Sequence, residues 1–276
     1  MRATAGQARA SADWLALREP ADAAARSPEL VEEIRSPFPV TGEAVVHDLG
    51  CGTGSMGRWL AAQLTGRQHW VLHDRDAELL AVAAAHPPDL AADGAPVTVE
   101  TRCHDITRLG PAELTGAALV TASALLDTMT AADLERFVAT CAAAGCPVLV
   151  TLTVTGRVEL TPADALDRRV AAAFNAHQQR TAGTGTLLGP RAVRAAVDGF
   201  TRRGFDVRVR ASPWRLGPGQ AALAAEWFSG WLAAACEQQP EMRAESSSYA
   251  RRRLAEAAAG RLRVTVDHRD LLALPR

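Results

Sequence analysis

The stretch VVHDLGCGTGSMG, from Val45 to Gly57, decides how this chain folds, because it reads as an apolar strand, a glycine-rich turn and the start of a helix. Residues 52–57 spell G-x-G-x-x-G, a pattern that holds the pyrophosphate of a dinucleotide at a helix N-terminus. Residues 48–54 spell D-x-G-x-G-x-G, which adds an acid at the end of the strand. A carboxylate repels a nearby pyrophosphate, so Asp48 favours a ligand that carries an ammonium group.

The rest of the chain alternates short apolar runs with helical patterns, which predicts an α/β fold with a doubly wound, mostly parallel sheet. Its 276 residues, 48 % of them hydrophobic, suit one domain over residues 1–276. We expect strands at 44–49, 69–73, 97–102, 118–123, 147–153, 206–212 and 261–268, and helices at 55–65, 76–86, 131–143 and 190–203.

Three stretches exceed what such a sheet needs. Residues 11–36 read as helices before the first strand and predict an N-terminal lid. Residues 154–189 and 217–259 are insertions, the second with two helical segments. Because ligands of α/β sheets bind at the carboxyl ends of the strands, we expect 11–36, 154–189 and 213–217 to enclose a pocket there.

The second and third expected strands also end in acids. Asp74 follows HWVLH, and a carboxylate there accepts hydrogen bonds from both hydroxyls of a ribose. Asp76 begins the next helical pattern and is expected to cap that helix. Asp105 and Ile106 follow the third strand and suit the amine and the flat face of an adenine, although a turn role for Asp105 is the alternative.

These three sites, in this order, resemble those of class I S-adenosylmethionine-dependent methyltransferases over residues 43 to about 153, with DLGCGTG as the most specific piece. The resemblance implies a Rossmann-like sheet whose last strand is antiparallel. It implies that S-adenosyl-L-methionine is the cofactor. The residues expected to bind it are Asp48, Gly50, Gly52, Gly54, Asp74, Arg75, Asp105, Ile106, Ser123 and Arg26.

Two other functions stay open beside methyl transfer. An NAD(P)-dependent oxidoreductase would use the same glycine-rich loop, but the only tyrosine, Tyr249, has no lysine partner because the chain contains no lysine. The missing lysine also excludes Schiff-base chemistry. A non-catalytic protein that binds S-adenosylmethionine is the second alternative.

The acceptor is expected to be a small molecule, as in specialised metabolism, methylated on O, N or C. The strand-four segment TASALLDTM lacks the motif with which amino-methylating nucleic-acid enzymes grip a flipped base. A net charge of −1 without a basic block also argues against nucleic acid. We expect no membrane segment, a cytoplasmic location and no metal, since the five cysteines form no C-x-x-C. A homodimer is compatible with the sequence.

The remaining candidates are less specific. Asp127 and His177 are candidate catalytic bases, with a helix cap and an exposed helix residue as the alternatives. In SPWRLG, Trp214 and Arg215 could bind a flat or anionic acceptor, or form a packed corner. Arg26 is expected to close over the carboxylate of the methionine, unless Arg18, Asp22 and Arg26 form an i,i+4 ion-pair ladder.

Overall fold

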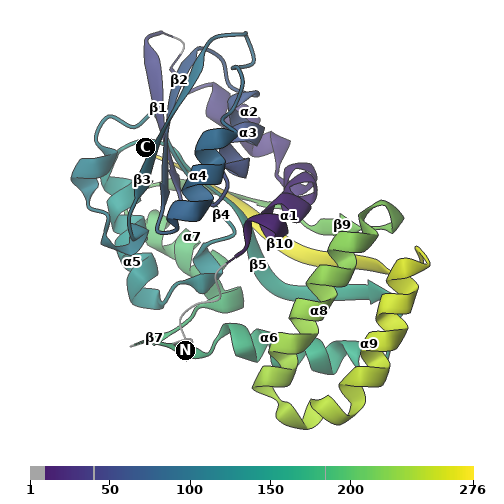
Figure 1. The fold of residues 1–276 in the computed structure, drawn as a ribbon. Coiled ribbons are helices and arrows are strands. Elements are labelled where there is room, and N and C mark those ends of the chain that lie inside the picture. The colour runs from purple at the N-terminus through teal and green to yellow at the C-terminus, as the bar shows by residue number, and fades with distance from the viewer. Residues whose placement is uncertain (1–9, 40, 184) are drawn as a thin grey trace.

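The computed structural model describes residues 10–39, 41–183 and 185–276, and its ribbon is drawn in Figure 1. The helices are α1 (Ala12–Ala25), α2 (Pro28–Arg35), α3 (Ser55–Ala61), α4 (Ala77–Ala85), α5 (Ala131–Ala143), α6 (Asp167–Gln178), α7 (Ala192–Arg202), α8 (Ala221–Gln238) and α9 (Arg243–Ala258). The strands are β1 (Glu43–Leu49), β2 (Arg67–Asp74), β3 (Val97–Cys103), β4 (Leu119–Ser123), β5 (Val148–Thr161), β6 (Thr181–Ala182), β7 (Gly185–Thr186), β8 (Asp206–Ala211), β9 (Trp214–Leu216) and β10 (Arg263–Leu274).

The main sheet has the strand order β3-β2-β1-β4-β5-β10-β8, with β9 as an extra partner of β10. Strands β1 to β5 run parallel to one another, whereas β10 runs antiparallel between β5 and β8. This topology confirms the expected α/β fold with a mostly parallel sheet and an antiparallel last strand. The order reverses between β1 and β4, which is where ligands bind in sheets of this type.

Apolar side chains cover both faces of the sheet. Helices α2, α3 and α4 contribute to one core cluster with β1 and β2, and α5 and α7 contribute to another with β4 and β5. In α2 the side chains of Leu30, Val31 and Ile34 are buried against the sheet. The helix therefore belongs to the core, and its burial stabilises the sheet by about 1.5–3 kcal/mol for each of these side chains.

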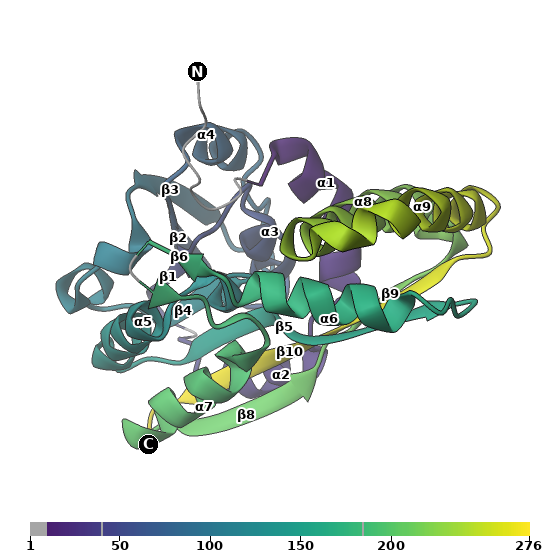
Figure 2. The same cartoon turned by 90° about the horizontal axis from the view of Figure 1, so that it is seen from below.

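Strands β5 and β10 extend beyond the parallel strands as an antiparallel pair, and a lobe of helices packs against this extension. Strand β5 was expected to end at residue 153, but its pairing with β10 extends to Thr161. Figure 2 shows α6, α8 and α9 gathered over this extension. Their apolar side chains form a third core cluster with Trp214 and Leu216 of β9. The two helices expected within 217–259 are α8 and α9.

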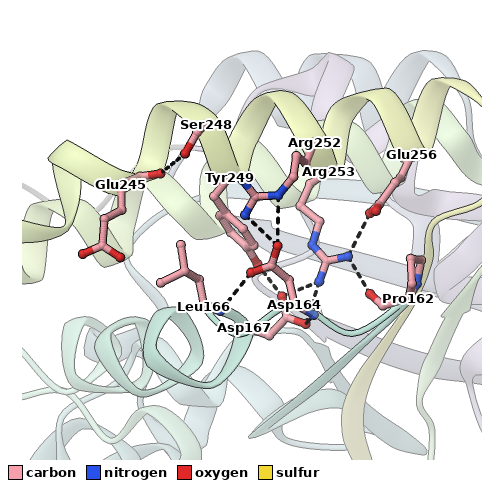
Figure 3. Close-up of polar contacts among 10 residues, drawn as sticks. All are labelled: Pro162, Asp164, Leu166, Asp167, Glu245, Ser248, Tyr249, Arg252, Arg253 and Glu256. Carbon is pink, nitrogen blue, oxygen red and sulfur yellow. Dashed lines mark hydrogen bonds and ion pairs between the residues drawn. The ribbon is translucent and has the colours of Figure 1, made fainter.

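Buried polar groups join α9 to α6 within this lobe (Figure 3). The side chain of Arg253 is 1 % exposed and donates to both carboxylate oxygens of Asp167 at 2.5 and 2.6 Å. The hydroxyl of Tyr249 donates to the same carboxylate at 2.6 Å. Arg253 also donates to the backbone oxygen of Pro162 and to Glu256. These contacts fix the position of α9 against the start of α6.

The expected N-terminal lid consists of two helices with different surroundings. Ser11 caps α1 through the backbone N–H of Trp14, and Ser27 caps α2, which begins with Pro28. The backbone N–H of Ser27 donates to Asp270 of β10 at 2.8 Å, which ties the start of α2 to the sheet. In the described part of the chain, no helix is both long enough and apolar enough to cross a bilayer.

Candidate functional site

A cavity of about 740 Å³ lies at the carboxyl ends of β1, β2 and β4 and is bounded by α1. This volume is in the range of small-molecule binding sites. Six aspartates and two arginines line it, so its charge is predominantly negative. The charged lining residues are Asp22, Asp48, Asp74, Asp76, Asp105, Asp133, Arg18 and Arg75.

The glycine-rich loop forms one wall of the cavity. Gly50, Gly52 and Gly54 have φ angles of 71°, 56° and 82°, in the left-handed region that residues with a Cβ avoid. A Cβ at Gly50 would also lie 3.2 Å from the side chain of Leu125. Gly50 and Gly52 line the cavity. The glycines therefore let the backbone turn sharply from β1 into α3 and leave room beside the loop.

Asp48 is the last residue but one of β1, lines the cavity and is 1 % exposed. Its Oδ1 accepts a hydrogen bond from the hydroxyl of Thr121 at 2.8 Å, whereas its Oδ2 has no hydrogen-bond partner within the described residues. Burial raises the pKa of Asp48 to about 6, although Thr121 and the nearby charge of Arg26 oppose the rise. An unpaired carboxylate oxygen at this depth fits a ligand that brings a cationic donor.

Asp74 ends β2 and is held from two sides. Its Oδ2 accepts from the backbone N–H of Gly52 at 2.9 Å, and its Oδ1 accepts from that of Asp76 at 2.9 Å. Asp76 caps α4 through the N–H groups of Glu78 and Leu79, as expected. The adjoining Arg75 is exposed and lines the cavity. The structure thus presents the Asp74 carboxylate in a fixed orientation beside the loop.

Three further predicted residues reach the cavity from the ends of β3 and β4. Asp105 accepts hydrogen bonds from the N–H and the hydroxyl of Thr107, so it does fill the alternative turn role while lining the cavity. Ile106 lines the cavity beside it. Ser123 ends β4, and its Oγ accepts from Thr151 at 3.0 Å.

Arg26 is not among the described residues that line the cavity. The side chain is buried, and its Nη2 donates to Ser55 at 3.3 Å and to Ser123 at 3.2 Å. Its guanidinium lies 5.3 Å from the ring centroid of Trp59. Burial lowers the pKa of Arg26. Its Nε and Nη1 find no hydrogen-bond partner within the described residues.

Sequence reasoning missed the part that Arg18 plays at the cavity. Arg18 lines the cavity and forms a two-pronged ion pair with Asp22, with N···O distances of 2.9 and 3.1 Å. Its guanidinium also lies 5.0 Å from the ring centroid of Trp214. The i,i+4 spacing of Arg18 and Asp22 predicted their ion pair, but the ladder does not extend to Arg26, and nothing local indicated that the pair faces a ligand site.

The structure does not place Trp214 or Arg215 in the lining of the cavity. The segment SPWRLG contains strand β9, and its apolar-polar-apolar order turns Trp214 and Leu216 inward and Arg215 outward. The Nε1 of Trp214 donates to Asp22 at 2.9 Å. The packed-corner alternative describes this segment better, because neither residue is among the described residues that line the cavity.

The two candidate bases are also outside the cavity lining. Asp127 is half-buried in the short 3-10 helix after β4, and Gln178 of α6 donates to its Oδ2 at 3.5 Å. Burial raises the pKa of Asp127, and its neighbour Thr128 does line the cavity. His177 lies on α6 with its Nε2 3.3 Å from Glu237 of α8, at the contact between two helices of the lobe. Within the described residues, insertion 154–189 contributes no cavity-lining residue.

Comparisons with known proteins bear on the family and the fold. Residues 46–147 match a family model described as a methyltransferase domain. The cyclopropane synthase MmaA2 of Mycobacterium tuberculosis has a similar structure, with a TM-score of 0.51, 13 % identity and coverage of 95 % of this chain and 94 % of that one. A methyltransferase from Geobacter sulfurreducens, solved with S-adenosyl-L-homocysteine, gives a TM-score of 0.45, 14 % identity and coverage of 96 % and 99 %. A search of curated proteins found no match.

Proposed function

We propose that this chain, which belongs through residues 46–147 to the S-adenosylmethionine-dependent methyltransferases of class I fold, methylates a small-molecule acceptor in the cavity above β1, β2 and β4. The observation that carries the proposal is the unpaired Oδ2 of Asp48 in a cavity whose charged lining residues are mostly aspartates. Such a cavity attracts a ligand with ammonium and sulfonium charges and repels a pyrophosphate.

The residues around the cavity fit the methyl donor group by group. Asp48 would accept from its ammonium group, and Arg26, with two unpaired nitrogens nearby, would supply positive charge for its carboxylate. Asp74 and Arg75 would hold the ribose, and Asp105 and Ile106 would flank the adenine. When bound, S-adenosylmethionine supplies an electrophilic methyl group, so the protein needs chiefly to align the acceptor and to exclude water.

The acceptor would lie between α1 and the loop that follows β4. Leu15, Arg18 and Asp22 line that side of the cavity from α1, and Leu125 and Met129 line it from the loop. The mixture of apolar walls and one fixed ion pair suits a small organic molecule with a polar group. Asp127 stays the candidate proton acceptor for acceptors that must lose a proton, because its raised pKa makes it a stronger base.

Titration calorimetry with S-adenosylhomocysteine and with NADH tests the proposal. We expect S-adenosylhomocysteine to bind and NADH to give no heat of binding. Tight NADH binding without a signal from S-adenosylhomocysteine would instead support the oxidoreductase alternative. Formation of S-adenosylhomocysteine from the donor in the presence of candidate acceptors then separates an enzyme from a protein that only binds the donor.

A further inference from the structure

Each of the three carboxylates expected to hold the methyl donor directly follows a histidine. The pairs are His47–Asp48 at the end of β1, His73–Asp74 at the end of β2 and His104–Asp105 after β3. Side chains alternate between the faces of a strand, so the histidines of β1 and β2 point away from the carboxylates that follow them. The imidazoles of His47 and His73 thereby meet on one side of the sheet, and the ring of His104 joins them from the turn after β3.

The three rings form a continuous hydrogen-bonded stack. The Nδ1 of His47 lies 2.8 Å from the Nε2 of His73, and the Nδ1 of His73 lies 2.7 Å from the Nε2 of His104. Neighbouring ring centroids are 5.1 and 4.9 Å apart, with interplanar angles of 24° and 17°. His47 and His73 are buried and His104 is half-buried. These contacts fix the lateral spacing of three strand ends.

The backbone of the same histidines holds the ligand side of the site. The carbonyl oxygen of His73 accepts from Gly50 at 2.8 Å and from Cys51 at 3.0 Å, so it anchors the glycine-rich loop. The N–H of His104 donates to the carbonyl oxygen of Asp74 at 2.9 Å. A shift of one ring would therefore be passed through the backbone to the loop and to the carboxylates.

Two rings of the stack, those of His47 and His73, are uncharged at neutral pH. Burial lowers the pKa of His47 to about 4 and that of His73 to about 3; the positive charge of Arg102 adds to the effect, and the negative charge of Glu100 opposes it. A neutral imidazole has one N–H and one free lone pair. Because His73 takes part in both N–H···N bonds, it donates one of them and accepts the other, and His47 then has the same tautomer as His73, either Nδ1–H or Nε2–H.

We propose that His47, His73 and His104 are positioning residues that set the spacing of Asp48, Asp74 and Asp105 for the methyl donor, an inference that rests on the proposed function. Replacing the middle ring tests it most directly, because His73 takes part in both N–H···N bonds. His73→Phe keeps the ring volume and removes both bonds. We expect the Kd for S-adenosylhomocysteine to rise about tenfold, the order expected for the loss of two hydrogen bonds.

His69→Phe is the matched control. His69 lies on the same strand and the same face as His73 and contacts Thr98 of β3 at 2.8 Å, but no carboxylate follows it. We expect this variant to bind S-adenosylhomocysteine like the native protein. An equal loss of affinity in both variants would attribute the effect to general disturbance of β2 and would overturn the positioning role.

Two further measurements complete the test. NMR of the native protein should show ¹⁵N–¹⁵N couplings across the two N–H···N hydrogen bonds between neighbouring rings. Their absence would refute the hydrogen-bonded stack. If His73→Phe does not fold, His104→Phe removes only the outer bond at a half-buried ring, and the Kd should rise about threefold. Unchanged affinity in the folded variant would overturn the positioning role alone, whereas native protein that binds no S-adenosylhomocysteine would overturn the proposed function.

Discussion

Asp48 is a carboxylate in a position where ionisation is unfavourable without a ligand. Its side chain is buried, and burial raises its pKa from 3.8 to about 6. In the ligand-free protein, the protonated form therefore adds stability that is fully present below pH 3.8 and is lost as the pH rises through about 6. An ammonium group that pairs with Oδ2 would reverse this preference and favour the ionised form.

This coupling gives a pH dependence for binding. We expect affinity for S-adenosylhomocysteine to rise with pH up to about 6 and to level off above it, with release of a proton on binding near that pH. Calorimetry in buffers of different ionisation enthalpy measures the proton. Asp48→Asn is the control and should remove both the proton release and this pH dependence; unchanged proton release in that variant would assign the titration to another group.

Asp74 and Asp76 are two carboxylates near one turn with different expected roles. Asp74→Ala should lose about 2–4 kcal/mol of donor affinity, because two charge-assisted hydrogen bonds to the ribose disappear. Asp76→Ala removes the cap of α4 and should lower the free energy of unfolding by about 1 kcal/mol with a much smaller effect on affinity. Calorimetry and urea unfolding of both variants measure the difference. The reverse ranking would place the ribose at Asp76.

At the scale of elements, the two N-terminal helices are expected to have different roles: α2 is needed for folding, and α1 is needed for methyl transfer. From the sequence, residues 1–36 could be one lid over a self-sufficient sheet. The structure instead buries Leu30, Val31 and Ile34 of α2 in the sheet core. We expect removal of residues 1–36 to abolish folding, and removal of residues 1–25 to leave the circular dichroism of the sheet intact while methyl transfer is lost. Native-like dichroism after the longer deletion would contradict this division.

The arginines of α9 give a second comparison between elements. Arg253 is buried against Asp167, whereas the side chain of the adjacent Arg252 is 50 % exposed and pairs with Asp164 at 2.7 Å. Arg253→Ala should lower the free energy of unfolding by about 3–5 kcal/mol, because it leaves a largely buried carboxylate with only the Tyr249 hydroxyl as a partner. Arg252→Ala should cost about 0–1 kcal/mol. Urea unfolding measures both, and similar values would mean that water reaches Asp167.

An element could be predicted from the sequence when interactions between residues close in the sequence form it. Strands β1 to β4 and their helices follow from local apolar patterns and turn residues, and the sequence placed them within a few residues. Strand β9 and the extension of β5 form by pairing with β10. In the case of β5, the paired segments lie about a hundred residues apart in the sequence. Arg18 reaches the cavity for the same reason, since the packing of α1 against β9 sets its direction.

The charge of the whole molecule leads to a prediction about macromolecular partners. The chain carries 30 basic and 31 acidic residues, and six aspartates with two arginines line the cavity. Affinity for nucleic acid depends chiefly on cationic side chains that displace counterions from phosphates. A near-neutral protein with an acidic cavity therefore lacks this contribution where the donor and the acceptor would meet.

We expect no shift of tRNA or duplex DNA in an electrophoretic assay at physiological salt, with or without S-adenosylhomocysteine. A basic RNA-binding protein in the same assay serves as the positive control. Salt-sensitive, specific tRNA binding would contradict the small-molecule proposal, because the steepness of the salt dependence counts the phosphates that the protein neutralises. The acceptor would then be one nucleotide of a tRNA, and exposed arginines outside the cavity would have to bind the remainder of the tRNA.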